Sequence, residues 1–351
     1  ISVFVYLCIF GSRKEKLYLN FLFCFLFTDS YNKEDVQKVI ESDWYVKRFL
    51  LARGRNVEEA FKMIRDAMRW RNEYGFALMK DSDFPFEFYK IGGLFPYEKD
   101  KQGNVMIYMR IKLHRKIPEL EEPVKRFIMH IVNKVDKETD GNGMGIVFDC
   151  TGAGYVNIDM DFLSFLVTTG TSYFPVGLKY ILVYDLPWIL TPFRKVAMAL
   201  VPGKMQQLIK FANKNDITEF IARENLPDYL GGTCKRNYRA VPFGCLSVFE
   251  MARAYGFPEE DIQRIRPIFD PFLEQAEIEL ANGDYVDPPG FGSNIEGMKE
   301  DNANNFDMTT TVMNGYANGK QTNILKVFPP DIIEFNYEQN VSSYQAFVIL
   351  E

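Results

Sequence analysis

The sequence predicts an α/β protein in which a helical N-terminal part precedes a mostly parallel β-sheet. Two observations carry this prediction. Short apolar segments without polar alternation, such as Met144–Phe148 and Tyr180–Tyr184, are typical of buried parallel strands, and they are separated by helical segments. Residues 31–74, in contrast, show only helical periodicity. This alternation leaves a two-layer and a three-layer arrangement of the sheet and its helices open.

Residues 31–80 are predicted to form a small helical subdomain. Asp29 or Ser30 is the expected cap of its first helix, and Asn56, with Glu59 three residues later, is the expected cap of the next. Gly75 ends that second helix. The apolar residues of the second helix recur at helical spacing: Ala60, Phe61, Ile64, Ala67, Met68 and Trp70.

Residues 81–235 are predicted to form the sheet domain. Strands are expected over 104–112, 144–148 and 180–184, helices over 123–137, 160–173 and 192–200, and a helix start followed by a strand-like end over 205–212. Hydrophobic residues make up 47% of the 351 residues, which is enough for a domain of this size to bury a core.

The two ends of the chain are read differently. Residues 1–30 hold two apolar runs, each shorter than the roughly 18 residues that span a bilayer, and are interpreted as a fragmentary or mispredicted start, with a signal or anchor as the alternative. Residues 236–323 are an acidic helical extension and linker, with 13 acids and 3 bases between positions 257 and 307. Residues 324–351 show strand-like alternation too short to bury a core alone.

Few side chains of this sequence could carry out catalysis. Neither a P-loop nor a nucleophile elbow is present, and the glycines at 141, 143 and 145 precede a strand instead of following one. The strand end Asp149–Gly152 permits a phosphotransferase or phosphatase that uses Asp149, although a turn-capping aspartate explains it equally well. Two histidines and five scattered cysteines argue against a metal site and for free thiols. The acidic tail and the lack of a basic-aromatic array argue against nucleic-acid binding.

Several motifs together resemble the CRAL-TRIO (Sec14-like) lipid-binding family. Val46–Arg55 and the pair Trp70-Arg71 resemble its helical N-terminal region. The strand end, a helix exit, a turn and a terminal motif resemble its core domain in the family's order: Asp149–Gly152, Tyr173–Pro175, Pro187-Trp188 and Leu226–Thr233. The resemblance covers about residues 31–235.

The resemblance implies a lipid carrier without catalytic residues, metal or cofactor. A gate helix over Thr191–Val201, hinged at Pro192 and Pro202, would close an apolar cavity. The expected cavity residues are Ile107, Met109, Phe148, Phe162, Leu166, Phe174, Leu182, Tyr184 and Trp188, and the expected gate residues are Phe193, Val196, Ala197 and Leu200. Family members that transfer phosphatidylinositol carry a glutamate and a lysine where this chain has Val176 and Gln207, so the resemblance does not imply an inositol lipid.

A basic cluster around the first helical break has two interpretations. Lys47, Arg48, Arg53 and Arg55 form either a solvated face or a patch that contacts anionic lipid headgroups. A membrane surface is therefore an expected partner beside the lipid ligand.

The last 28 residues, 324–351, resemble the start of a major sperm protein (MSP) domain, with an apolar strand, a proline turn and a second strand. This order of domains is similar to that of motile-sperm-domain tethers of the endoplasmic reticulum. It implies a cytoplasmic protein associated with endomembranes, and FFAT-type acidic peptide partners only if a complete MSP domain exists. A scaffold protein without a lipid ligand is the alternative function.

Overall fold

The computed structural model describes residues 31–289 and residue 291. The segments predicted at 1–30 and 324–351, and residues 292–323 of the predicted extension and linker, lie outside the described residues. The chain divides into two compact units, one of residues 1–246 with 269–292 and one of residues 247–268 with 293–351. All sites discussed below belong to the first unit.

The helical subdomain consists of α3 (Lys33–Glu41), α4 (Asp43–Ala52) and α5 (Val57–Tyr74). Side chains cap all three N-termini: Asn32 accepts from the amide of Glu34, Ser42 from that of Tyr45, and Asn56 from those of Glu58 and Glu59. The prediction for Asn56 is confirmed. The prediction that Asp29 or Ser30 caps the first helix is wrong for α3, because Asn32 holds that position.

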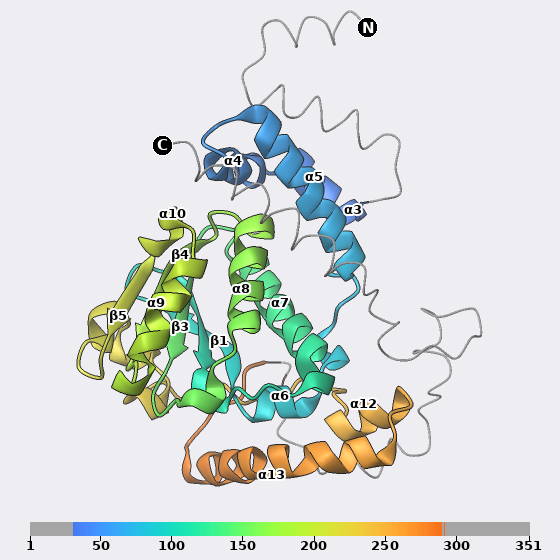
Figure 1. The fold of residues 1–351 in the computed structure, drawn as a ribbon, viewed down its shortest axis with the longest axis vertical. Helices are drawn as coiled ribbons and strands as arrows, with labels where there is room; N and C mark the ends of the chain where they lie inside the picture. Colours follow the sequence, from blue (N-terminus) through green and yellow to red (C-terminus); the bar gives the residue numbers. More distant parts are fainter. Residues whose placement is uncertain (1–30, 290, 292–351) are drawn as a thin grey trace, which may run out of the picture. The chain divides into compact units, whose positions relative to one another are not determined.

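Five strands form one sheet in the order β1-β2-β3-β4-β5 (Figure 1). They are β1 (Leu94–Lys99), β2 (Val105–Arg110), β3 (Met144–Asp149), β4 (Leu178–Tyr184) and β5 (Ile209–Ala212). Strand β1 pairs antiparallel with β2, and all other pairs are parallel. The predicted mixed α/β fold with a mostly parallel sheet is confirmed.

Helices connect the parallel strands in sequence. They are α7 (Glu121–Glu138), α8 (Met160–Tyr173), and α9 (Thr191–Leu200) with the short α10 (Gly203–Gln206). Because each connection joins neighbouring parallel strands in the same direction along the sheet, right-handed crossovers place all of these helices on one face (Figure 1). We call this the helix face.

The remaining elements are short or lie beyond the sheet domain. Helix α6 (Phe86–Lys90) precedes β1, and helix α11 (Ile217–Phe220) follows β5. Two further helices come after the sheet domain, α12 (Val248–Ala254) and α13 (Glu259–Asn282). The 3-10 helices are Asp81–Asp83, Ile111–Leu113, Pro118–Leu120, Tyr155–Asn157, Trp188–Leu190, Arg223–Asn225 and Asp228–Leu230.

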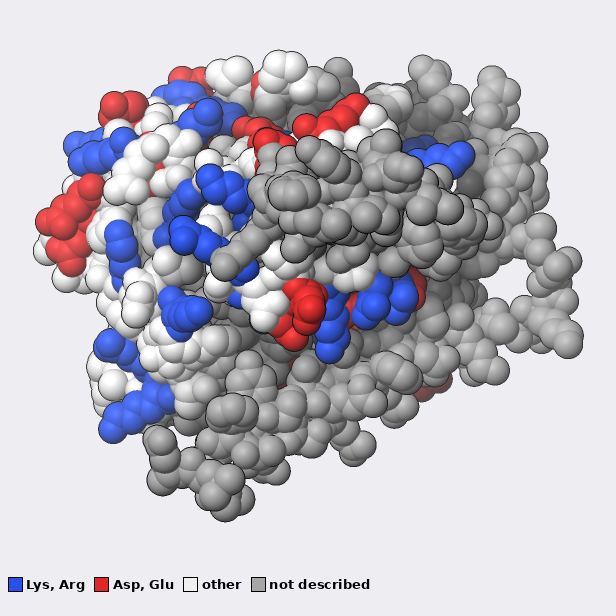
Figure 2. All heavy atoms as spheres, turned by 90° about the horizontal axis from the view of Figure 1, so that it is seen from above, with Lys and Arg blue, Asp and Glu red and all other residues white. Residues whose placement is uncertain are grey.

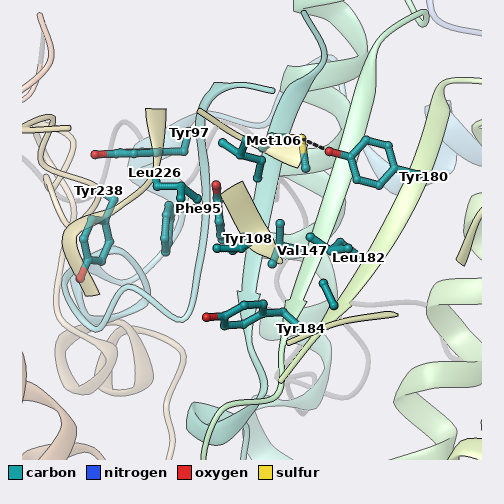
Figure 3. Packing of buried hydrophobic residues seen from close by; sticks show 13 residues of the cluster. Phe95, Tyr97, Met106, Tyr108, Val147, Tyr180, Leu182, Tyr184, Leu226 and Tyr238 are labelled. Carbon is teal, nitrogen blue, oxygen red and sulfur yellow. Dashed lines mark hydrogen bonds between the residues drawn. The ribbon is translucent and has the colours of Figure 1, made fainter. Parts of the chain in front are cut away.

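The other face of the sheet, here called the closed face, is covered by the chain between Ile217 and Tyr238. Its strand residues alternate with those of the helix face. They form one buried cluster with the covering segment, and no residue of this cluster is more than 7% exposed. Figure 3 shows these side chains lying against one another in a continuous layer from Tyr238 to Leu182. The strand residues of the cluster are Phe95, Tyr97, Met106, Tyr108, Val147, Tyr180, Leu182, Tyr184 and Ala212.

Candidate functional site

Two uninterrupted rows of apolar side chains cross the helix face from β2 to β5. The register of the strands aligns Ile107, Ile146, Ile181 and Ile209 in one row, and Met109, Phe148, Val183 and Phe211 in the next. Side chains aligned in this way lie close enough to form a continuous apolar surface.

The burial of these rows decreases across the sheet. Ile107 and Met109, on β2, are 1% and 7% exposed. The row members on β3 and β4 and Ile209 of β5 are only half-buried, and Phe211 at the edge is 38% exposed. Central strands of parallel sheets are normally covered on both faces. The side chains of residues 31–289 therefore do not fully cover the apolar surface beneath α8 and α9.

Helix α8 has the same property. It carries apolar residues around most of its circumference, a pattern typical of a buried helix, yet Thr169 is its only buried residue. Phe162, Leu166 and Thr169 share one side of the helix at spacings of four and three residues. Because Thr169 is buried, this side of α8 faces the protein. Phe162 and Leu166 lie on the same side but are only half-buried.

Helix α9 lies on the helix face without burying any of its residues. Its half-buried residues are Phe193, Ala197 and Met198, whereas Val196 and Leu200 are 53% and 40% exposed. The four predicted gate residues recur at spacings of three and four and lie along one side of the helix, which the described residues cover only in part. Val201, just after the helix, is buried.

Few interactions hold α9 in place. At its N-terminal end the ring of Phe193 meets that of Tyr155 edge-on, with 5.7 Å between the centroids, and the guanidinium carbon of Arg194 lies 3.6 Å from the centre of the Phe211 ring of β5. At its C-terminal end the side-chain amide of Gln206 donates to the carbonyl oxygens of Met198 and Val201, at 3.0 and 2.9 Å. A helix attached mainly at its ends needs little energy to move.

The segment around α9 is positively charged. Residues 186–215 contain no acid and five bases: Arg194, Lys195, Lys204, Lys210 and Lys214. Of these, only Lys214 forms an ion pair among the described residues, 3.7 Å from Asp185. Figure 2 views the molecule from above, the end of the sheet domain at which Figure 1 labels α10. Several Lys and Arg side chains lie on the described part of this surface. The segment also contains Trp188, which is 85% exposed.

The structure corrects the predicted positions of two cavity residues. Leu182 and Tyr184 belong to the closed face, so the prediction that they share a surface with Phe148 is wrong. Phe148 is aligned with Val183, and alternation places Ile181 with it. The sequence of β4 (LKYILVY) is apolar at successive positions and did not reveal which residues face the helices.

Phe174 and Trp188 are not part of the helix-face rows either. Phe174 packs edge-on against Trp70 and Phe76, with centroids 6.1 and 6.2 Å apart, and so joins α8 to the helical subdomain. The ring of Tyr173 stacks on Trp70 at 4.0 Å. Trp188 is too exposed to line an interior, and its predicted place in a cavity is wrong.

Arg48 is a structural residue, and its predicted contact with lipid headgroups is wrong. Its guanidinium is 2% exposed and forms two hydrogen bonds with the Asp136 carboxylate, at 2.9 and 2.7 Å. Its Nε donates to the carbonyl oxygen of Pro175 at 2.6 Å. Lys47, Arg53 and Arg55 are exposed and form no ion pair among the described residues.

Val176 and Gln207, which replace the family's charged residues, are both exposed. Val176 has a φ of 63°, a strained conformation for a β-branched residue. Neither residue supplies a charge to a lipid headgroup.

The described residues do not form a catalytic centre around Asp149. Burial raises the pKa of this carboxyl group, and its Oδ1 accepts from the amide of Thr151 at 3.0 Å, as in an Asx-turn. Burial also raises the pKa of the Cys150 thiol to about 12, which keeps it protonated at neutral pH. Within residues 31–289, no three His, Cys, Asp or Glu side chains are grouped to hold a metal ion. No helix in the same part of the chain is long and apolar enough to cross a bilayer.

Comparison with known proteins shows what the sheet domain is similar to. Residues 90–232 match the family model of the CRAL/TRIO domain. The tyrosine-protein phosphatase non-receptor type 9 of Homo sapiens is 26% identical over 216 residues, covering 60% of this chain and 36% of that protein. The CRAL-TRIO domain-containing protein C3H8.02 of Schizosaccharomyces pombe is 26% identical over 219 residues, covering 59% and 48%.

A third relative carries a functional name. The phosphatidylinositol transfer protein CSR1 of Eremothecium gossypii is 25% identical over 210 residues, covering 54% of this chain and 47% of that protein. The crystal structure of Sfh5 is 14% identical, with a TM-score of 0.47, and covers 60% of this chain and 78% of that chain. This chain spans about a third to a half of the length of the three sequence relatives. Residues 90–232 are thus similar to the CRAL/TRIO domain, and the sequence relatives match the same part of the chain at 25–26% identity.

Proposed function

We propose that this chain binds a lipid without transforming it, and that the acyl chain lies along the helix face beneath α8 and α9. The observation that carries the proposal is the pair of complete apolar rows that remain half-buried from β3 to β5. Apolar surface exposed to water is unfavourable, at roughly 25 cal/mol per Å². A ligand with a hydrocarbon chain would cover this surface and remove that cost.

Helix α9 is the proposed gate. None of its residues is buried, and two hydrogen bonds from Gln206 and two ring contacts, of Phe193 with Tyr155 and of Arg194 with Phe211, hold it. Each methylene moved from water onto the helix face contributes about 0.8 kcal/mol, so even part of an acyl chain gives substantial affinity. Opening α9 breaks few interactions by comparison.

The segment 186–215 is the proposed membrane-docking surface. It combines five bases and no acid with exposed apolar side chains, among them Trp188, Val196 and Leu200. Bases near an anionic bilayer contribute about 1 kcal/mol each, while apolar side chains insert between the headgroups. The gate and the docking surface are then the same segment, so that contact with a membrane favours opening.

The relatives support a lipid and leave its headgroup open. One is named as a phosphatidylinositol transfer protein, but Val176 and Gln207 supply no charges for an inositol phosphate. We therefore propose that this chain transfers or senses a lipid recognised mainly through its acyl chain. The cytosolic face of an internal membrane is the proposed location, since Cys150, Cys234 and Cys245 are all free thiols.

Extraction of a fluorescent phosphatidylcholine from vesicles tests this function. Leu166→Trp fills space on the sheet-facing side of α8 and should lower the extraction rate by about tenfold, as expected when close to 1.4 kcal/mol of binding is lost. Ile40→Trp, at a residue that is 46% exposed on α3, is the matched control and should extract lipid at the wild-type rate. Equal rates for Leu166→Trp and the wild type would contradict the proposal.

The docking surface is tested by vesicle flotation. Lys195→Glu with Lys204→Glu should weaken binding to anionic vesicles by about tenfold or more, because each reversal exchanges an attraction of about 1 kcal/mol for a repulsion. Binding that does not change with either the substitutions or the salt concentration would exclude docking by these bases.

A further inference from the structure

Arg239 lies buried beside the closed face with hydrogen-bond donors that have no partner. It is 3% exposed, and its Nη2 donates to the Glu279 carboxylate of α13. Its Nε and Nη1 find no acceptor among the described residues. A buried N–H of a charged group without an acceptor is destabilising, and natural proteins rarely keep one without a reason.

Arg110, at the end of β2, repeats this arrangement. Its Nη1 is buried and has no acceptor within the described part of the chain. The guanidinium carbon lies 4.3 Å from the centre of the Tyr229 ring, and no carboxylate there comes within ion-pair distance. The Tyr229 hydroxyl is also buried and unpartnered in the described structure.

The guanidinium groups of Arg110 and Arg239 each lie against a tyrosine ring, and these two rings are neighbours. The guanidinium of Arg239 lies 4.9 Å from the centre of the Tyr238 ring, and the Tyr229 and Tyr238 rings are 5.6 Å apart. Figure 3 shows Tyr238 at the edge of the closed-face cluster, beside Phe95. The backbone amide of Arg110 donates to the Gly93 carbonyl at 2.8 Å.

Gly92 makes room for Arg239 in this arrangement. It has a φ of +65°, and a Cβ there would lie 3.0 Å from Cγ of Arg239. The turn before β1 thus contacts both residues, the Arg239 side chain at Gly92 and the Arg110 backbone at Gly93.

The balance of charges around Arg110 and Arg239 favours the binding of an anion. Arg239 is paired with one carboxylate, that of Glu279, and no ion pair of Arg110 is found among the described residues. The nearby Asp149 carboxyl group is buried, which raises its pKa and weakens its repulsion of an anion. Three guanidinium nitrogens, Nη1 of Arg110 with Nε and Nη1 of Arg239, and the Tyr229 hydroxyl remain as donors. A phosphate group offers several acceptor oxygens in the geometry that planar guanidinium groups bind best.

We propose that Arg110 and Arg239 form a phosphate-binding site on the closed-face side of the sheet, separate from the lipid-binding helix face. The Tyr229 hydroxyl is the third donor, and the Tyr229–Tyr238 pair holds both guanidinium groups in position. The phosphate belongs either to a small soluble phosphate or to a phosphomonoester lipid headgroup.

Titration calorimetry of the whole chain with inorganic phosphate, at constant ionic strength, tests this site. The wild type should bind phosphate, and Arg110→Met should bind it about tenfold or more weakly, since a hydrogen bond to a charged group has an effect of this size. Arg110 is only half-buried, so its substitution is the least disruptive to folding. Arg53→Met, at an exposed arginine, is the matched control and should leave phosphate binding unchanged.

Tyr229→Phe gives a second measurement that does not depend on removing a charge. It should weaken phosphate binding while the thermal unfolding temperature without phosphate stays the same or rises, because an unpartnered buried hydroxyl is removed. Failure of the wild type to bind phosphate, or equal affinity of wild type and Arg110→Met, would overturn the proposal.

Vesicles distinguish the two sources of phosphate. If binding to phosphatidylcholine vesicles that contain phosphatidic acid weakens in Arg110→Met, the site accepts a lipid headgroup. If only inorganic phosphate binding weakens, the ligand is a soluble phosphate. Leu166→Trp should not change phosphate affinity, so the result is independent of the helix-face proposal.

Discussion

The two faces of the sheet are built from the same strands and are covered in different ways. On the closed face every clustered side chain is at most 7% exposed, and large tyrosines from three strands interlock with the segment 217–238. On the helix face the side chains are mostly aliphatic, and those of β3 to β5 remain half-buried beneath α8 and α9. Both faces are apolar, so hydrophobic composition does not explain the difference. What differs is whether the chain itself supplies the covering side chains.

The two faces can therefore have different roles, one in stabilising the fold and the other in the lipid binding that we propose. The closed face supplies the packed core that stabilises the sheet. The helix face can then remain incompletely covered, because the fold does not depend on it to the same extent. A continuous exposed apolar surface in a soluble domain usually marks a binding site.

The largest expected difference between the faces is in stability. Leu182→Ala removes a fully buried side chain of the closed face and should lower the free energy of unfolding by about 2–5 kcal/mol. Ile181→Ala, the adjacent position on the helix face, should lower it by roughly 1 kcal/mol, since its side chain is already half-exposed. Urea unfolding of both variants measures the contrast, and equal losses would show that the faces are packed alike.

A smaller effect is expected at the end of the proposed gate. Gln206→Ala removes the two hydrogen bonds to the carbonyls of Met198 and Val201 and should destabilise the closed position of α9 by about 1 kcal/mol. Lipid exchange between vesicles should become about fivefold faster, provided that opening limits the rate. Gln207→Ala, at the exposed neighbouring glutamine, is the control, and an equal change in both variants would argue against a gate at α9.

The smallest expected effect is a dependence of stability on pH that involves neither face. Burial alone would raise the pKa of Asp81, but hydrogen bonds from His130 and Lys134 lower it from 3.8 to about 2. A lowered pKa of an acid stabilises the folded state above the unfolded value, and this contribution is lost as the pH falls from 3.8 towards 2. Its size is on the order of 1 kcal/mol after solvent screening.

Asp81→Asn should therefore unfold with a weaker pH dependence in acid than the wild type, as followed by circular dichroism. Asp161→Asn removes a fully exposed partner of Lys116 and is the control. If both variants retained the acid sensitivity of the wild type, Asp81 would not be a source of it.

The sequence predicted most of the sheet domain because its elements are long and strongly patterned. The predicted helix 160–173 coincides with α8, and the predicted strands 104–112, 144–148 and 180–184 overlap β2, β3 and β4. Strand β1 was missed, because its sequence LFPYEK contains a proline and no regular alternation. As an antiparallel edge strand it tolerates both.

The site was less predictable because it depends on pairings that the sequence does not show. The residues of β4 are apolar at successive positions, so the sequence does not show which of them lie on the same face as Phe148. The strand register shows that Val183 does. Arg48 lies in a motif with exposed bases, and its partner Asp136 is 88 residues away. Phe193 and Val196 fit the same apolar pattern on α9, and the sequence does not show that Val196 is exposed while Phe193 is half-buried.

Native mass spectrometry of the chain purified from cells tests the central claim most directly. Our account predicts a lipid mass on the wild type and on Ile40→Trp, and its loss in a folded Leu166→Trp variant. Wild-type protein that carries no lipid from any of several expression hosts, and takes none up from vesicles, would contradict the account.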